Sequence, residues 1–185
     1  ILLSSFGTIF TALFCALFCF YAIKMSFAES FLIGAIISST DAASVFSILR
    51  SKSLNLKYNT APILEMESGS NDPFAYMLTM LGLVLLKGGE ISTITPMLFK
   101  QLFYGISLGV LIALFAVYVF RKTRILVEGT DSIFIVATAL AAFAVPELIG
   151  GNGYLSVYIA GIIIGNSRIK NKIRMIHFFD GITAL

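Results

Sequence analysis

The sequence predicts an all-α bundle of about six to seven transmembrane helices, and three observations support this fold class. Of the 185 residues, 58% are hydrophobic and only 12% are charged, with a mean hydropathy of +0.94, whereas a soluble domain carries roughly 25% charged residues. Apolar segments of about 20 residues recur, each long enough to cross a bilayer core of roughly 30 Å as a helix. These segments do not alternate apolar and polar residues, as the strands of a transmembrane barrel do.

Six apolar segments are predicted to form helices, and a seventh helix is expected to begin near residue 175. Their approximate ranges are 1–23, 28–49, 59–86, 98–120, 131–147 and 153–167. The chain starts in apolar sequence without an initiator Met or a basic leader, and it stops where a new apolar segment begins. We therefore expect residues 1–185 to be part of one transmembrane domain that continues beyond both ends.

Basic residues predict how these helices are oriented in the membrane. If the connection after the second helix is cytoplasmic, ten of the thirteen Lys and Arg residues fall in cytoplasmic loops, within residues 50–57, 121–124 and 168–174. The opposite side keeps only Lys24, Lys87 and Lys100. This asymmetry follows the positive-inside rule, so we interpret the basic loops as a topology signal and assign them no ligand.

The second predicted helix contains the polar run Ser38-Ser39-Thr40-Asp41 more than half-way along its length. Such side chains compete for backbone groups and favour helix caps over helix interiors. Capping residues in the middle of a spanning segment indicate a helix that breaks and restarts. Transporters place such breaks near the membrane midplane, where the helix ends face an ion site. We expect Thr40 and Asp41 to cap those ends.

The third predicted helix carries the run LEMESGSNDPF in its first half. An ionisable side chain in the membrane interior costs at least roughly 2.5–3.5 kcal/mol, and such residues usually line a substrate, ion or proton path. Ser68 and Asp72 share a helix face, as do Glu67 and Asn71, because each pair is four residues apart. Pro73 has no N–H, so the carbonyl four residues earlier loses its usual partner.

These two polar segments predict an oxygen-only site inside the membrane. Asp41 and Asp72 each lie about a dozen residues past the start of helices that run in opposite directions, so they reach similar depths at roughly 1.5 Å per residue. Carboxylate, hydroxyl and carbonyl oxygens suit alkali cations and protons. Neither segment contains Cys or His, which argues against zinc, copper or haem.

Three sequence motifs resemble those of a known family, the electroneutral monovalent cation:proton antiporters, which include bacterial NhaP-type exchangers and animal sodium/proton exchangers. The motifs are SSTDAASVFSIL, ESGSNDP and GGNGYLSVYIAGIIIGN, in family order and spacing. TDAA and ESGSNDP are most similar to the bacterial potassium/proton branch. The resemblance implies the cation/proton antiporter fold, with a discontinuous helix at the ion site. It also implies exchange of K⁺ or Na⁺ for H⁺ across the cell membrane, without enzymatic activity or a cofactor.

The resemblance also implies roles for individual residues. Asp72 is the carboxylate that takes either a proton or a cation. Asn71 stands where other members have a second Asp, and its presence goes with electroneutral one-for-one exchange. Thr40 and Asp41 lie at the crossing of the unwound helices. Ser68 lies near the cation, so that the bound ion contacts Asp72, Ser68 and Thr40.

Two further positions follow from the same resemblance. Glu67 matches a family Glu that forms a structural ion pair with an Arg on a later helix, which lies beyond residue 185. Ala42 stands where many relatives have Pro directly after the Thr-Asp pair, so the predicted helix break depends on the capping residues alone. The expected partners are the exchanged ions, membrane lipid and a second copy of the protein, and no nucleic acid.

Three alternatives stay open from the sequence. The polar cluster can serve only to hold helices together, although interhelical hydrogen bonds contribute about 0.6–2 kcal/mol each, too little to offset three buried acids. A passive cation channel would need a filter of carbonyl rings, and no such loop is evident. An intramembrane aspartyl protease would need Asp41 and Asp72 to share a proton at about 3 Å, and the Gly-x-Gly-Asp setting of those enzymes is missing.

Two glycine pairs have the spacing that lets membrane helices approach closely, Gly105 with Gly109 and Gly161 with Gly165. For both pairs we expect close packing inside the bundle.

Overall fold

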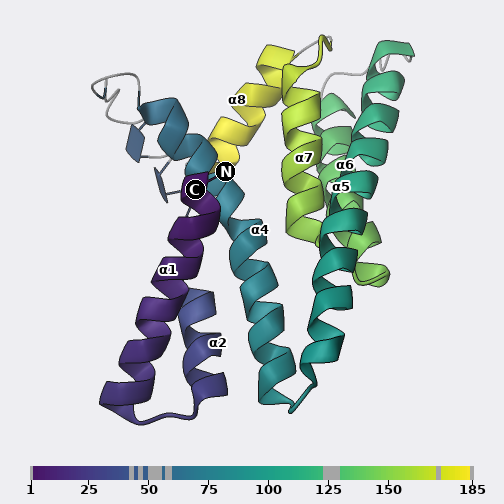
Figure 1. The fold of residues 1–185 in the computed structure, drawn as a ribbon. Helices are drawn as coiled ribbons and strands as arrows, with labels where there is room; N and C mark the ends of the chain where they lie inside the picture. Colours follow the sequence, from purple (N-terminus) through teal and green to yellow (C-terminus); the bar gives the residue numbers. More distant parts are fainter. Residues whose placement is uncertain are drawn as a thin grey trace. The chain divides into compact units, whose positions relative to one another are not determined.

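The computed structural model describes residues 2–41, 44–45, 48–49, 56, 60–122, 130–169 and 172–183. The elements in these residues are helices (Figure 1). Three of them are long and apolar enough to cross a membrane, at Ser4–Ile23, Ser92–Lys122 and Thr130–Leu148. The predicted all-α transmembrane bundle is therefore confirmed. The chain folds as two compact units, Ile1–Phe99 and Lys100–Leu185.

The first unit begins with an antiparallel pair of helices (Figure 1). Helix α1 (Leu2–Phe18) continues into a π-helical turn, η1 (Cys19–Ile23), which ends at Lys24 in the left-handed conformation with φ 62°. Helix α2 (Phe27–Ile37) then starts from a capping box. In this box the Ser26 hydroxyl accepts the N–H of Glu29, and the Glu29 carboxylate accepts the N–H of Ser26 at 3.2 Å.

Small side chains let α1 and α2 pack closely. The buried face of α1 carries a small residue at every fourth position, Ser4, Thr8, Ala12 and Ala16. Opposite this face lies Gly34 of α2, where an added Cβ would stand 2.2 Å from the carbonyl oxygen of Ala12. Only glycine permits this approach. Helix α4 (Ala61–Leu86) packs against both α1 and α2, so three helices enclose the interior of the unit.

The second unit contains most of α5 (Ile91–Lys122), together with α6 (Thr130–Leu148), α7 (Gly153–Asn166) and α8 (Lys172–Thr183). Its hydrophobic core consists of mostly small side chains from α5, α6 and α7, namely Ala113, Ala116, Val117, Ala142, Ala160 and Ile164. Side chains of this size allow the three helix backbones to come close together.

The helix ranges predicted from hydropathy agree with the structure except at α2 and α5. Helix α2 ends early, at the polar run discussed below. Helix α5 begins at Ile91, seven residues before the predicted start at residue 98. Its first turn is polar and is held by Glu90, whose carbonyl accepts both the N–H and the hydroxyl of Thr93, at 3.0 and 2.7 Å. Hydropathy does not detect a helical turn outside the apolar segment.

The two glycine pairs differ in their surroundings. A Cβ on Gly105 would stand 3.0 Å from the carbonyl oxygen of Asn152, and one on Gly109 would stand 2.7 Å from that of Ser156, so this pair does bring α5 and α7 together. A Cβ on Gly161 or Gly165 would meet no atom of the described chain within 4 Å outside its own helix neighbourhood. The expected close packing of the second pair inside the bundle therefore stays a prediction.

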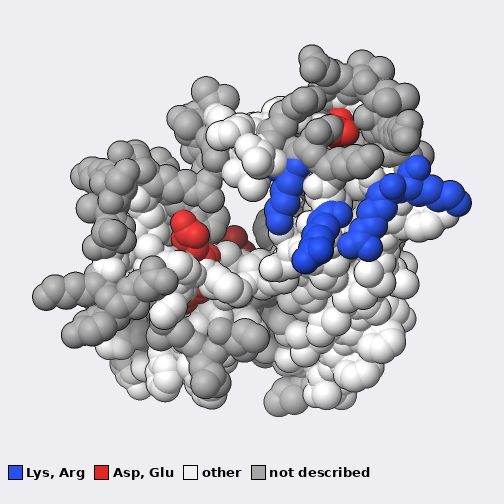
Figure 2. All heavy atoms as spheres, turned by 90° about the horizontal axis from the view of Figure 1, so that it is seen from above, with Lys and Arg blue, Asp and Glu red and all other residues white. Residues whose placement is uncertain are grey.

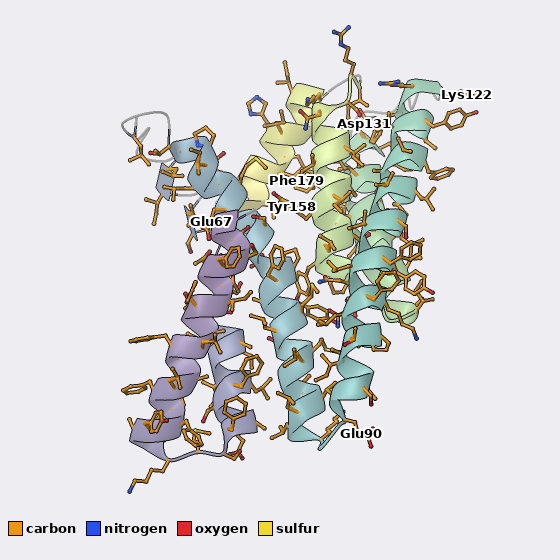
Figure 3. The ribbon with its side chains drawn as sticks, viewed as in Figure 1. Glu67, Glu90, Lys122, Asp131, Tyr158 and Phe179 are labelled. Atoms are coloured by element: carbon orange, nitrogen blue, oxygen red, sulfur yellow. The ribbon has the colours of Figure 1, made fainter. Side chains whose placement is uncertain are left out.

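Basic side chains of the second unit gather at one end of its helices, as Figure 2 shows in blue. The described residues there are Arg121, Lys122, Arg168 and Lys172. Figure 3 marks Lys122 at this end of α5 and Glu90 just before its other end. Other members of the predicted basic loops lie outside the described residues, namely Arg50, Lys52, Lys57, Arg124 and Lys170.

Candidate functional site

The polar run after α2 lies at a break in the helical backbone. Helix α2 ends at Ile37, Ser38 forms a turn, and residues 39–41 are not helical. The next described helical residues are 44–45 and 48–49, and the carbonyl of Asp41 accepts the N–H of Val45 at 3.2 Å. This is the first hydrogen bond of a new helical turn. The helix discontinuity predicted from the capping residues is thus present in the described part of this segment.

Helix α4 passes beside this break and stays helical through Pro73. Its sequence turns Ser68, Asn71 and Pro73 inward, and these three residues are buried. Ser68 and Asn71 are three residues apart, so they lie on neighbouring positions of one helix face. Two further acids of this segment, Glu65 and Glu67, are half-buried.

Thr40 connects the broken segment to α4 through two hydrogen bonds. The amide nitrogen of Asn71 donates to the Thr40 hydroxyl, and the hydroxyl oxygens of Thr40 and Ser68 are 3.2 Å apart. The side chains of Asn71 and Ser68 are each only 1% exposed. Among the residues that the structure describes, the remaining acceptor of Asn71, Oδ1, has no hydrogen-bond partner. An unpaired buried acceptor of this kind costs roughly 1–3 kcal/mol.

Asp72 is joined to the same break by a residue that the sequence did not single out. The hydroxyl of Ser39 donates to Oδ1 of Asp72 at 2.5 Å. Asp72 is half-buried, whereas Ser39 and Thr40 are exposed within this chain. Ser39 is one of two consecutive serines, and its neighbour Ser38 instead donates to the carbonyl of Ala35 at 2.7 Å. The sequence contains no signal that distinguishes these two serines.

The two aspartates of the site have different partners. The hydroxyl of Ser44 donates to Oδ2 of Asp41, and the Ser39 hydroxyl donates to Oδ1 of Asp72. A shared-proton pair of the aspartyl-protease type would join the carboxylates directly, so this arrangement gives that alternative no support.

Glu67 lies on α4 on the site's N-terminal side, where Figure 3 labels it. Its backbone carbonyl accepts the Ser70 hydroxyl at 3.1 Å. The Arg expected to pair with its carboxylate would lie outside this chain, so the structural ion pair stays a prediction.

The arrangement brings together carboxylate, hydroxyl and amide oxygens from two segments of the first unit. Thr40, Ser68 and Asn71 form one linked group, and Ser39 joins Asp72 to the same non-helical stretch. Oxygen ligands without sulfur or imidazole suit hard cations. A helix break also exposes backbone groups that are normally paired within a helix.

Comparison with known proteins agrees with the motifs. The family described as sodium/hydrogen exchanger, transmembrane, matches residues 1–182. The chain is 33% identical to a K⁺/H⁺ antiporter NhaP2 of Shewanella oneidensis over 98% of its own length, and 31% identical to a K⁺/H⁺ antiporter NhaP of Alkalimonas amylolytica over 100%. It is 27% identical over 99% of its length to a Na⁺/H⁺ antiporter NhaH of Halobacillus aidingensis.

The chain spans 32% of the length of the NhaP2 and NhaP relatives and 47% of the NhaH relative. Within that span the family match extends over nearly all of its residues, and the helices are those of a multi-pass membrane protein. The chain therefore belongs to the sodium/hydrogen exchanger family of transmembrane proteins.

Proposed function

We propose that this chain forms the ion-binding part of a secondary antiporter that exchanges K⁺ or Na⁺ for H⁺ across the cytoplasmic membrane. The names of the relatives support cation/proton antiport, since both K⁺/H⁺ and Na⁺/H⁺ antiporters match the whole chain. In this proposal Asp72 binds the exchanged ion, Ser68 and Thr40 supply further oxygens, and Asn71 and Asp41 complete the site.

The unpaired amide oxygen of Asn71 carries this proposal. This oxygen is buried, and Asn71 directly precedes Asp72 in the sequence. The amide nitrogen of the same side chain already donates a hydrogen bond to Thr40. A cation held at the Asp72 carboxylate would offer this acceptor a partner, and a buried polar atom without a partner calls for an explanation of this kind. The observation therefore favours ion binding over a cluster that only holds helices together.

Competition at one carboxylate is enough to couple the two ion flows. A proton and a monovalent cation each bring one positive charge, and each neutralises Asp72 when it binds. An empty site keeps a bare charge, which crosses the low-dielectric membrane interior at high cost, so the site changes sides only when occupied. Asn71 adds no second charge, and the exchange is therefore expected to be electroneutral.

The orientation and the partners follow from the same proposal. The basic ends of the second unit face the cytoplasm by the positive-inside rule, and the transporter works as a homodimer in lipid. Light scattering from the complete protein in detergent measures its molecular mass, and a monomeric mass would contradict the homodimer.

The test of the function is proton efflux from proteoliposomes that contain the complete protein, driven in turn by potassium, sodium, rubidium and lithium. Efflux should saturate with cation concentration, and it should leave the membrane potential unchanged. A passive channel would instead let cations cross without proton movement and would build up a potential. Cation flux that continues when protons cannot exchange would overturn the proposal.

A further inference from the structure

Ser39 differs from its neighbour Ser38 and from Ser70 in what its hydroxyl contacts. Ser38 and Ser70 donate to carbonyls three residues earlier in their own segments, Ala35 and Glu67. Such bonds are local and are common in helices. Ser39 instead reaches Asp72, 33 residues away on α4, at 2.5 Å. It is free to do so because residues 39–41 are not helical.

The chemistry of a hydroxyl fits both states of an ion-binding carboxylate. A serine hydroxyl has one donor and two acceptor lone pairs, and it rotates to suit its partner. In the structure it donates its proton to the Asp72 carboxylate. When a cation occupies the carboxylate, rotation about one bond turns the proton away and presents a lone pair to the ion. No backbone movement is needed for this exchange of roles.

Exposure distinguishes Ser39 and Thr40 from the buried oxygens of the site. The side chains of Ser68 and Asn71 are each 1% exposed. Ser39 is exposed within this chain, and Asp72 is half-buried. A partly hydrated cation that approaches Asp72 can therefore replace a water molecule by the Ser39 hydroxyl before it reaches the buried oxygens.

We propose that Ser39 is a further cation-binding residue, whose hydroxyl oxygen ligates the ion held by Asp72. The proposal rests on the proposed function, in which Asp72 binds the exchanged cation. The ion that Ser39 would bind is a monovalent cation coordinated by oxygen atoms.

The experiment measures initial proton efflux from proteoliposomes of the complete protein against K⁺ concentration, and separately against Na⁺, at one pH. In Ser39→Ala we expect the cation KM to rise about fivefold, as for the loss of one polar contact of ordinary strength. The maximal rate should stay within about twofold of the unmodified protein. Ser38→Ala is the matched control, because the Ser38 hydroxyl donates to the carbonyl of Ala35 in its own helix, and the KM of this variant should not change.

A second pair of variants separates the hydroxyl from the shape of the side chain. Ser39→Thr and Ser39→Val have nearly the same volume and branching, and only threonine keeps the hydroxyl. We expect the KM of Ser39→Thr to stay near that of the unmodified protein, and the KM of Ser39→Val to rise like that of Ser39→Ala. An unchanged KM in Ser39→Ala, a lower maximal rate without a change in KM, or equal KM values for the Thr and Val variants would each overturn the proposal.

Asp72→Asn in the same assay distinguishes failure of this inference from failure of the proposed function. If Asp72→Asn keeps cation-driven proton efflux, the proposed function is wrong and the role of Ser39 is lost with it. If Asp72→Asn is inactive while Ser39→Ala behaves like the unmodified protein, only the role of Ser39 is wrong.

Discussion

The two units place the same kinds of polar side chain at helix ends but pair them differently. In the second unit, the N–H groups of Gly153 and Leu155 at the start of α7 donate to Glu147 and Asn152, at 2.9 and 3.0 Å. These partners lie six and three residues apart in the chain. In the first unit, Ser39 and Thr40 bond to side chains of α4 that are 28 to 33 residues away.

This difference separates a cap from a candidate site. The caps of α7 pair backbone donors with nearby acceptors, which is the usual way to satisfy a helix start. The bonds of the first unit connect side chains between segments and include a carboxylate. The second unit also has buried atoms without partners, Gln101 Oε1 and Ser156 Oγ. In the described part of the chain the Asn71 side chain also bonds across segments to Thr40, the neighbour of the Ser39 that bonds Asp72, so an unpaired atom alone does not mark a site.

The largest expected effect comes from exchanging one acid in each unit for its amide. Asp72→Asn should reduce cation-driven proton efflux to the level of empty vesicles, because a neutral amide cannot trade a proton for a cation. Glu147→Gln keeps a side-chain oxygen for the N–H of Gly153, so efflux should persist. Both variants are compared at equal protein amount after size-exclusion chromatography, and loss of efflux in both would contradict the distinction between the units.

A smaller effect is expected from the two buried asparagines. Asn71→Ala removes the open acceptor next to Asp72 and should raise the cation KM about tenfold. Asn152→Ala removes the acceptor for the N–H of Leu155 at the start of α7, which should cost about 1 kcal/mol of stability and leave the KM unchanged. Transport kinetics and thermal melting of each purified variant check both results. If only Asn152→Ala altered the KM, the cation site would lie in the second unit, and its assignment to the first unit would be wrong.

The third effect concerns stability only, and it compares two glycines of the second unit. Gly109→Ala puts a Cβ 2.7 Å from the carbonyl oxygen of Ser156, and overpacking of this kind typically costs roughly 1–3 kcal/mol. Gly161→Ala meets no described atom within 4 Å outside its own helix neighbourhood, so it should not reduce stability. Thermal melting in one detergent measures both variants. Equal melting temperatures for the two variants would contradict the close contact of α5 with α7 at Gly109.

The sequence predicts the helices well because the membrane determines their length and polarity. It also predicts the break after α2, since Ser, Thr and Asp side chains have an intrinsic preference for helix ends. The family motifs place Thr40, Ser68 and Asn71 at one ion site, and the structure links the three by hydrogen bonds. Their function as ion ligands stays a prediction.

Other features depend on geometry that spacing does not contain. Ser38 and Ser39 are chemically identical, and only the turn at the end of α2 decides which hydroxyl faces Asp72. Gly105 and Gly161 both belong to small-xxx-small pairs, but only the first has a neighbouring helix against it. In both cases the missing information is the direction in which a residue points, which depends on tertiary packing.

The π-helical turn η1 at the end of α1 predicts where the first unit tolerates the deletion of one residue. A π-helical turn holds one residue more than an α-helical turn, and η1 follows the stripe of small residues that ends at Ala16, with Cys19 of η1 also buried. Deleting Ala22 should therefore convert η1 into an ordinary turn and leave that stripe in register. Deleting Leu13 would rotate Ala16 away from α2 and lower the melting temperature more. Equal destabilisation by the two deletions would show that η1 does not accommodate the loss of a residue.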